Sequence, residues 1–286
     1  MEEGVVANVR YWLVEHPTVR TFEWRPGRTW GASPLFLVPT LFAYLSMTSL
    51  LYFTKKSTAR NPSTSPNTSP PSVLRIISAV HSLLLVLLSL TMALGCALST
   101  LTQAPDIRWI FCFPANHTPP RGPVFFWAYI FYLSKILEFG DTALILLSNS
   151  IRRLTFLHVY HHSVVLVMCY VWLETSQSLV PVALVTNAAV HVVMYWYYAV
   201  CALGGRPRWK RAVTDLQIGQ FVISFGVSVG MLWMHFGSGG GGGCSGFWGW
   251  VFNAVFNGSL LVLFNDFHKR SYNESRRRGV KGKKDE

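Results

Sequence analysis

Residues 73–101 read VLRIISAVHSLLLVLLSLTMALGCALSTL, a stretch in which Arg75 is the only permanently charged side chain. The hydrocarbon core of a bilayer needs about 20 mainly apolar residues per helix, so this stretch predicts a membrane-spanning helix. Comparable stretches recur along the chain and predict seven spans in all, at 34–53, 73–101, 124–148, 155–173, 178–203, 212–236 and 247–268. The expected fold class is an all-α integral membrane protein with seven transmembrane helices.

The overall composition agrees with a membrane protein built as one domain. Hydrophobic residues make up 51% of the 286 residues and charged residues only 13%, against about 25% charged residues in ordinary soluble domains. The membrane domain is expected at 34–268, after an N-terminal segment at 1–33 and before a basic tail at 269–286. Residues 57–72 are so rich in Ser, Thr and Pro that they predict a flexible linker. The acidic start predicts no cleaved signal peptide.

The basic residues are distributed unevenly between the two sides that seven spans create. Eighteen lie on the side of the C-terminus and six on the other side, which by the positive-inside rule predicts a cytosolic C-terminus and a lumenal N-terminus. This asymmetry accounts for most of the net charge of +12. It removes the main reason to expect nucleic acid as a partner.

Three short signals concern covalent modification and location. The sequon at Asn116 lies in an expected lumenal loop, where it can be glycosylated. Cys112 and Cys244 also lie in expected lumenal loops, where an oxidising compartment permits a disulfide. Lys283 and Lys284 stand fourth and third from the C-terminal end, as in a dilysine signal for retrieval to the endoplasmic reticulum, although a basic tail can also bind lipid headgroups.

Ionisable side chains inside spans are costly and therefore indicate function. In the third span they are Lys135, Glu138 and Asp141, and at the start of the fourth they are His158, His161 and His162. Spacings of three and four residues place each set on one helical face. The fifth and sixth spans add a polar stripe, with Asn187, His191, Met194, Tyr195, Tyr198, Gln217 and Gln220. We expect these faces to meet in one buried cavity that opens to the cytosol.

The histidines alone leave several functions open. Imidazole can act as a base, a nucleophile or a metal ligand, and di-iron membrane desaturases and hydroxylases use the same HxxHH spacing. Those enzymes need about eight histidines for two irons, whereas only the histidine box and His191 lie near the expected cavity. A metal-dependent lipid oxidoreductase is therefore the second enzymatic hypothesis. A transporter or a seven-span receptor would be non-enzymatic alternatives.

Four motifs resemble, in order, the hallmark boxes of the ELO family of fatty acid elongases. They are Lys135-x-x-Glu138-x-x-Asp141-Thr142, His158-x-x-His161-His162, Asn187-x-x-x-His191-x-x-Met194-Tyr195-x-Tyr197-Tyr198 and Thr214-x-x-Gln217-x-x-Gln220. The resemblance covers roughly residues 34–286, and the long linker is similar to that of the plant-type branch.

The resemblance implies a very-long-chain 3-oxoacyl-CoA synthase of the endoplasmic reticulum that condenses acyl-CoA with malonyl-CoA and uses no cofactor or metal. It implies that spans two to seven form a helical barrel around an acyl-chain tunnel. It also implies a ping-pong mechanism in which His161 is the nucleophile and His191 assists the malonyl step. His158 and His162 would orient the groups or share protons, Glu138 and Asp141 could fix tautomers, and Lys135 would partly neutralise these carboxylates. The partners implied are the reductases and dehydratase of the elongation cycle. A homodimer is a further possible assembly.

Coenzyme A is anionic, and the expected cytosolic loops carry six bases that could bind it. They are Arg152, Arg153, Arg206, Arg208, Lys210 and Arg211. The positive-inside rule alone would also place bases there.

Overall fold

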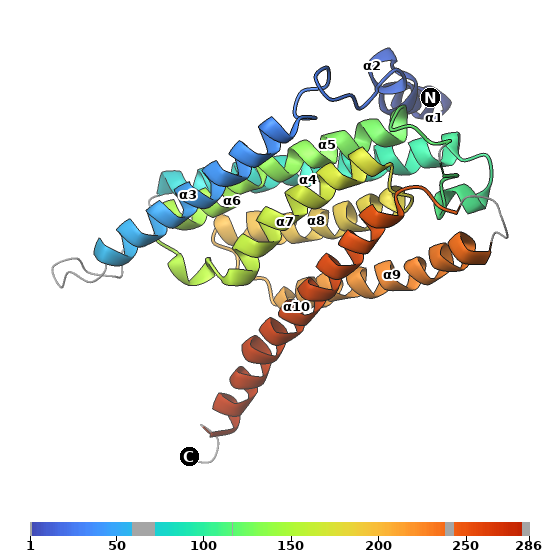
Figure 1. Cartoon of the computed structure of the whole chain (residues 1–286). Coiled ribbons are helices and arrows are strands. Elements are labelled where there is room, and N and C mark those ends of the chain that lie inside the picture. Colours follow the sequence, from blue (N-terminus) through green and yellow to red (C-terminus); the bar gives the residue numbers. More distant parts are fainter. Residues whose placement is uncertain (1, 59–71, 116, 238–242, 282–286) are drawn as a thin grey trace.

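The chain folds into a bundle of long helices, as a computed structural model of the protein shows (Figure 1). The structure describes residues 2–58, 72–115, 117–237 and 243–281, with the backbone alone for residues 2, 3, 58 and 270–281. These ranges contain no β-strand, and their only extended pairings are isolated bridges between Glu23 and Arg121 and between Pro114 and Cys244. The predicted all-α fold class is therefore confirmed for the described part of the chain.

Six helices in the described ranges are long and apolar enough to cross a bilayer. They are α3 (Pro34–Thr58), α4 (Ser72–Gln103), α7 (Phe156–Thr175), α8 (Val180–Ala202), α9 (Lys210–Gly237) and α10 (Phe247–Lys281). Each coincides with one of the predicted spans to within a few residues at its start. The protein is thus a multi-pass membrane protein.

The expected third span at 124–148 is not one continuous helix. It consists of α5 (Pro123–Leu137) and α6 (Phe139–Leu147), which meet at Glu138. The backbone N–H of Asp141 donates to the carbonyl of Glu138 over 3.0 Å, a tighter 3₁₀-type turn that interrupts the α-helical pattern. The prediction of an unbroken helix was wrong at this point, where the polar residues of the span concentrate. Placed end to end, the two helices would extend about 37 Å.

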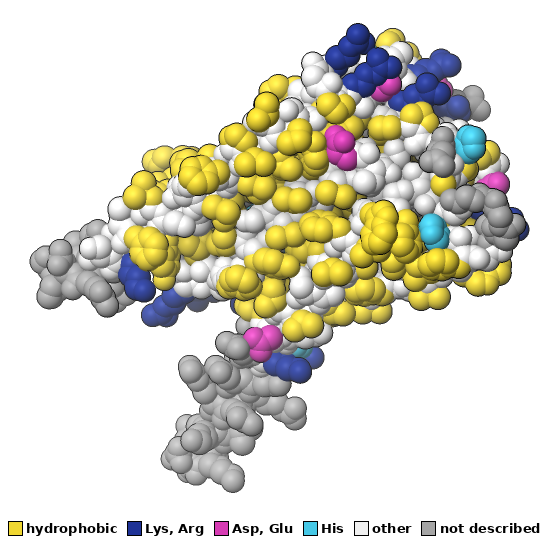
Figure 2. Space-filling view, in the orientation of Figure 1, with side chains coloured by type: hydrophobic (Ala, Val, Ile, Leu, Met, Phe, Trp, Pro, Cys, Tyr) yellow, Lys and Arg dark blue, Asp and Glu magenta, His cyan; other side chains and the backbone are white. Residues whose placement is uncertain are grey.

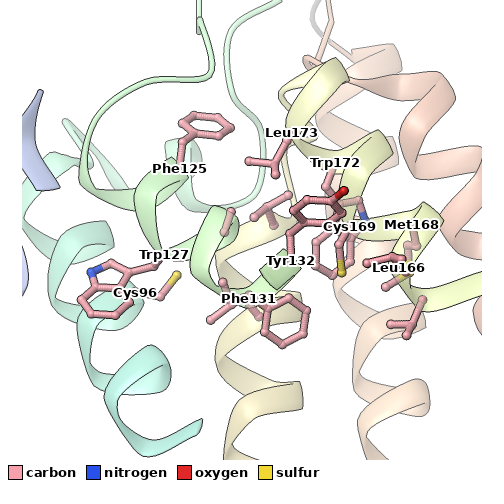
Figure 3. Close-up of a cluster of buried hydrophobic side chains, with 14 of the residues drawn as sticks. Cys96, Phe125, Trp127, Phe131, Tyr132, Leu166, Met168, Cys169, Trp172 and Leu173 are labelled. Atoms are coloured by element: carbon pink, nitrogen blue, oxygen red, sulfur yellow. The ribbon is translucent and has the colours of Figure 1, made fainter. Parts of the chain in front are cut away.

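The membrane helices pack in a closed order around a common centre. Helix α4 packs on α8, α8 on α9, α9 on α10, α10 on α7, α7 on α5, and α5 again on α4. Helix α3 lies outside this ring, against α6 and α7 (Figure 1). Inside the ring, apolar side chains of α4, α5 and α7 interlock, with Phe131, Tyr132 and Trp172 among them (Figure 3). These contacts hold α5 and α7, which carry the polar motifs, in a fixed relation.

The outer surface of the bundle is predominantly apolar. Large hydrophobic side chains stay exposed on the spans, including Leu35 at 86% and Trp233 at 77% of their full area. On the face drawn in Figure 2 they cover the middle of the molecule, and Lys and Arg side chains gather toward its two ends. Exposed apolar area of this extent indicates contact with lipid rather than water.

One end of the bundle is covered by the N-terminal segment (Figure 1). Its short helices are α1 (Glu2–Arg10), η1 (Tyr11–Glu15) and α2 (Pro17–Arg20). Trp24 follows them and is only 4% exposed, and its indole N–H donates to Glu174 of α7 over 2.8 Å. At the same end, a disulfide joins Cys112 to Cys244, with Cα atoms 4.9 Å apart. The segment and the loops therefore form one connected cap.

Candidate active site

The histidine box occupies the first two turns of α7. The side chain of Thr155 caps the helix by accepting a hydrogen bond from the backbone N–H of His158 over 3.2 Å, as N-cap threonines commonly do. The helical spacing then brings the rings together, with His162 4.4 Å from His158 and 5.4 Å from His161 between ring centroids. The sequence predicts that the three imidazoles share one helical face, and the ring distances place them close together at the start of α7.

His158 is engaged with the neighbouring helices. Its Nε2 lies 2.8 Å from the hydroxyl of Thr142 on α6, and this hydroxyl lies 3.1 Å from the phenol oxygen of Tyr44 on α3. Tyr44 is only 6% exposed and was not among the predicted site residues, because a single tyrosine in an apolar span resembles an interfacial aromatic. The hydrogen bond to Thr142 fixes the orientation of the His158 ring.

A buried ionic cluster lies where α5 meets α6. The ammonium group of Lys135 donates to Glu138 Oε1 over 2.6 Å, and it sits 4.1 Å from the centre of the Phe131 ring. The same carboxylate oxygen lies 3.5 Å from Nδ1 of His191 on α8, too long for a strong hydrogen bond. Lys135 and Glu138 are 0% and 1% exposed. Glu138 therefore lies between Lys135 of the third-span motif and His191 of α8.

Asp141 has partners that the sequence reasoning did not foresee. Its Oδ1 lies 3.1 Å from Nε2 of His81 on α4, and its Oδ2 accepts a hydrogen bond from the Tyr195 hydroxyl over 2.8 Å. The expectation that Asp141 fixes the tautomer of a box histidine is not met, since Asp141 binds His81 instead. His81 is not among the residues that the sequence predicts near the cavity, although an ionisable residue within a span is itself a signal for function.

An internal cavity begins at His161 and continues between α5, α7, α8, α9 and α10. Its apolar lining includes Phe131, Val165, Met168, Trp172, Phe221 and Phe256. Asn187 and Gln220 also line it, and the Asn187 amide donates to Gln220 over 3.2 Å. Within the described part of the chain, His161 Nδ1 is buried without a hydrogen-bond partner. His161 is thus the one residue of the box that faces the cavity.

The remaining predicted residues that the structure describes lie outside the lining of this cavity. Gln217 donates to the sulfur of Met194 over 3.2 Å, while Tyr198 is 42% exposed and meets Tyr195 edge to face. The six candidate CoA-binding bases are all exposed, with Arg152 and Arg153 in η3 (Ile151–Arg153) just before the histidine box. The predicted glycosylation site at Asn116 and the lysines 283 and 284 lie outside the described residues.

Metal binding was the basis of the second enzymatic hypothesis. Among the residues that the structure describes, no group of three or more His, Cys, Asp and Glu side chains is arranged to hold a metal ion. The ring nitrogens of the box point to different partners, because Thr142 holds His158 and the cavity faces His161.

The fold and the site together define a multi-pass helical membrane protein with a histidine box whose His161 lines a mainly apolar cavity. The family model described as ELO: GNS1/SUR4 family matches residues 29–280. The chain belongs to this family of fatty acid elongases.

Individual relatives agree with the family assignment. The chain is 31% identical to a "Fatty acid elongase 3-like" protein of Arabidopsis thaliana, over 97% of this chain and 96% of that protein. It is 32% identical to "Fatty acid elongase A" of Dictyostelium discoideum, over 89% of both chains. It is also 32% identical to "Very long chain fatty acid elongase 5" of Xenopus laevis, over 50% of this chain and 48% of that protein. The predicted resemblance, including the similarity to a plant protein, is confirmed.

Proposed function

We propose that the protein is the condensing enzyme of fatty acid elongation, a very-long-chain 3-oxoacyl-CoA synthase. It joins a long-chain acyl-CoA with malonyl-CoA and yields 3-oxoacyl-CoA, CO2 and CoA. The observation that carries this proposal is the place of His161, an imidazole at one end of a mainly apolar internal cavity. The apolar lining of this cavity suits the chemistry of an acyl chain, and a nucleophile at its end would meet the thioester.

The proposed reaction has two stages. A ring nitrogen of His161 attacks the thioester carbonyl, the C–S bond breaks, and CoA leaves as a thiol after taking up a proton. Malonyl-CoA then loses CO2, and its carbanion attacks the acyl-imidazole carbon while the C–N bond breaks. The departing ring nitrogen takes up a proton, which restores the neutral imidazole. A water-poor cavity protects the acyl-imidazole from hydrolysis. His191, held near Glu138, assists the malonyl stage, and Thr142 orients His158.

The proposal extends to the number of spans, the acyl-chain tunnel and the orientation of the protein in the membrane. Helices α5 and α6 together form the third of seven spans, and spans two to seven enclose the acyl-chain tunnel, which the closed packing order of the helices supports. The histidine box and the exposed bases Arg152 and Arg153 lie near each other at the cytosolic end, where CoA would bind. The N-terminus is lumenal, the membrane is that of the endoplasmic reticulum, and the reaction needs no cofactor.

The test is a condensation assay on the purified full-length protein in nanodiscs. With a panel of saturated acyl-CoAs and malonyl-CoA labelled in carbon 2, we expect labelled 3-oxoacyl-CoA and one CO2 per product. With acyl-CoA alone, we expect one equivalent of free CoA and a protein mass increased by one acyl group. Lipid transport without product would support a transporter, and oxidised acyl chains would support the oxidoreductase hypothesis; either result contradicts the proposal.

Replacement of His81 with leucine is expected to lower kcat/KM by about tenfold and to reduce thermal stability. The reason is that a partly buried carboxylate, Asp141, loses one of its two hydrogen-bond partners, and such losses typically cost about 1–3 kcal/mol. His81→Gln retains an N–H donor of similar reach and should recover most of both quantities. Equal kcat/KM for the leucine variant and the parent protein would exclude a positioning role for His81.

A further inference from the structure

Beyond His161, three side chains that line the cavity have a buried polar atom without a hydrogen bond among the described residues. They are Asn187 (Oδ1) on α8, Trp172 (indole Nε1) on α7 and Asn253 (amide Oδ1) on α10. Asn187 is held by Gln220 through its NH2 group, and the other two, Trp172 and Asn253, are the more deeply buried pair. The two side chains are only 3% and 2% exposed, and both line the cavity that begins at His161. Buried polar atoms nearly always have a partner in native proteins, so this pair indicates a ligand group.

The packing of α10 against α7 places Trp172 and Asn253 at about the same height along the axis of the helix bundle. Gly249 lies so close to Thr175 that a side chain there would collide with the threonine hydroxyl, and it is within ordinary contact distance of Val171. Asn253 follows Gly249 by one helical turn, and Trp172 precedes Thr175 by about one turn on the antiparallel helix α7. Figure 3 shows Trp172 on α7 within the cluster of buried hydrophobic side chains, near Leu173 and Cys169.

The two atoms have complementary hydrogen-bonding roles. An indole N–H can only donate, and an amide oxygen can only accept. A hydroxyl group satisfies both at once, because its oxygen accepts from Trp172 and its proton is donated to Asn253. A carbonyl oxygen would satisfy only Trp172, and a hydrocarbon would satisfy neither.

The distance along α7 defines where on a substrate this hydroxyl would lie. Trp172 follows His161 by eleven residues, which corresponds to about 16 Å along a helix and to about 13 carbon atoms of an extended chain. We propose that Trp172 and Asn253 form a subsite for a hydroxyl group on the acyl chain, about 12 to 14 carbons from the thioester. This inference rests on the proposed function, since it takes His161 as the point where the acyl group is attached.

The experiment compares three 16-carbon acyl-CoAs on the full-length protein in nanodiscs. One is unsubstituted, one carries a hydroxyl at carbon 13, and one carries it at carbon 8. The hydroxyl at carbon 8 would lie about five carbons short of the proposed subsite. We expect kcat/KM for the 13-hydroxy chain to exceed that for the 8-hydroxy chain by tenfold or more. Thermal stabilisation by each acyl-CoA without malonyl-CoA gives a second readout that does not require condensation, and it should follow the same order.

Substitutions of Asn253 and Trp172 test whether these two residues cause the preference for the 13-hydroxy chain. Asn253→Leu keeps the approximate shape of the side chain and removes its polar atoms, and Trp172→Phe removes the N–H. Each should lower the ratio of kcat/KM for the 13-hydroxy chain to that for the unsubstituted chain by about tenfold. Met168→Leu changes an apolar lining residue and should leave this ratio unchanged.

Failure of the proposed function and failure of the hydroxyl subsite give different results. If the unsubstituted chain is not condensed, the proposed function fails, and the stabilisation readout still tests the subsite. If the ratio is the same in the parent protein, Asn253→Leu and Trp172→Phe, the two atoms bind water only and the subsite is overturned. Should Asn253→Leu fail to fold, Trp172→Phe alone decides the question.

Discussion

Replacement of His161 with alanine is expected to reduce formation of 3-oxoacyl-CoA by at least about a thousandfold, the loss typical of removing a covalent nucleophile. His161 is the residue of the histidine box that lines the internal cavity, and its buried Nδ1 has no hydrogen-bond partner within the described part of the chain. His158 is instead bound to Thr142. His162 likewise has an unpartnered Nδ1 among the described residues, so it is the cavity lining that singles out His161 as the nucleophile of the proposed function.

The same variant distinguishes a nucleophile from a residue that only positions the substrate. His161→Ala should release no CoA from acyl-CoA in the absence of malonyl-CoA, and its mass should not increase by an acyl group. It should keep the stabilisation that acyl-CoA gives, because the apolar cavity remains. His117→Ala, at an exposed loop position, is the matched histidine control and should behave as the parent protein. A His161→Ala protein that still becomes acylated would refute the assignment.

Most of the fold follows from hydropathy. The apolar stretches predict six of the described helices because lipid imposes a simple requirement of length and polarity. The third span differs because its polar residues serve the site rather than the helix. Periodicity describes which face Lys135, Glu138 and Asp141 share, but it contains no information on the turn at Glu138. It also does not show that the Glu138 carboxylate lies 3.5 Å from His191 of another helix, α8.

The sequence predicts which residue types make up the site, but it predicts less well which of these side chains contact each other. Spacing placed the histidines on one helix, but only tertiary packing decides that Thr142 binds His158 and that His81 binds Asp141. Asn253 shows the same limit. It has no motif and lies in an apolar span, and its relevance comes from the unpartnered oxygen that faces a cavity built by five helices.

The second large effect is expected from breaking the ion pair between Lys135 and Glu138. Glu138→Gln leaves the ammonium group of Lys135, which is 0% exposed, without its counter-charge at 2.6 Å. Loss of one partner of a buried pair destabilises a protein by about 3–5 kcal/mol. Thermal unfolding and size-exclusion profiles in detergent should therefore show a severely destabilised protein. Lys135→Met should be similarly destabilised, because it leaves the carboxylate unpaired.

The double variant Lys135→Met/Glu138→Gln separates stability from activity. With both charges absent, no uncompensated charge is buried, and most of the lost stability should return, since neutral replacements of buried ion pairs are often tolerated. Activity should not return, because Glu138 is also the group that faces His191 at 3.5 Å. Glu15→Gln breaks the half-exposed pair with Arg10 and serves as the control, with an expected effect of about 0–1 kcal/mol. Equal stability losses for the single and double variants would contradict this account, and so would a fully active double variant, because the pair would then serve packing alone.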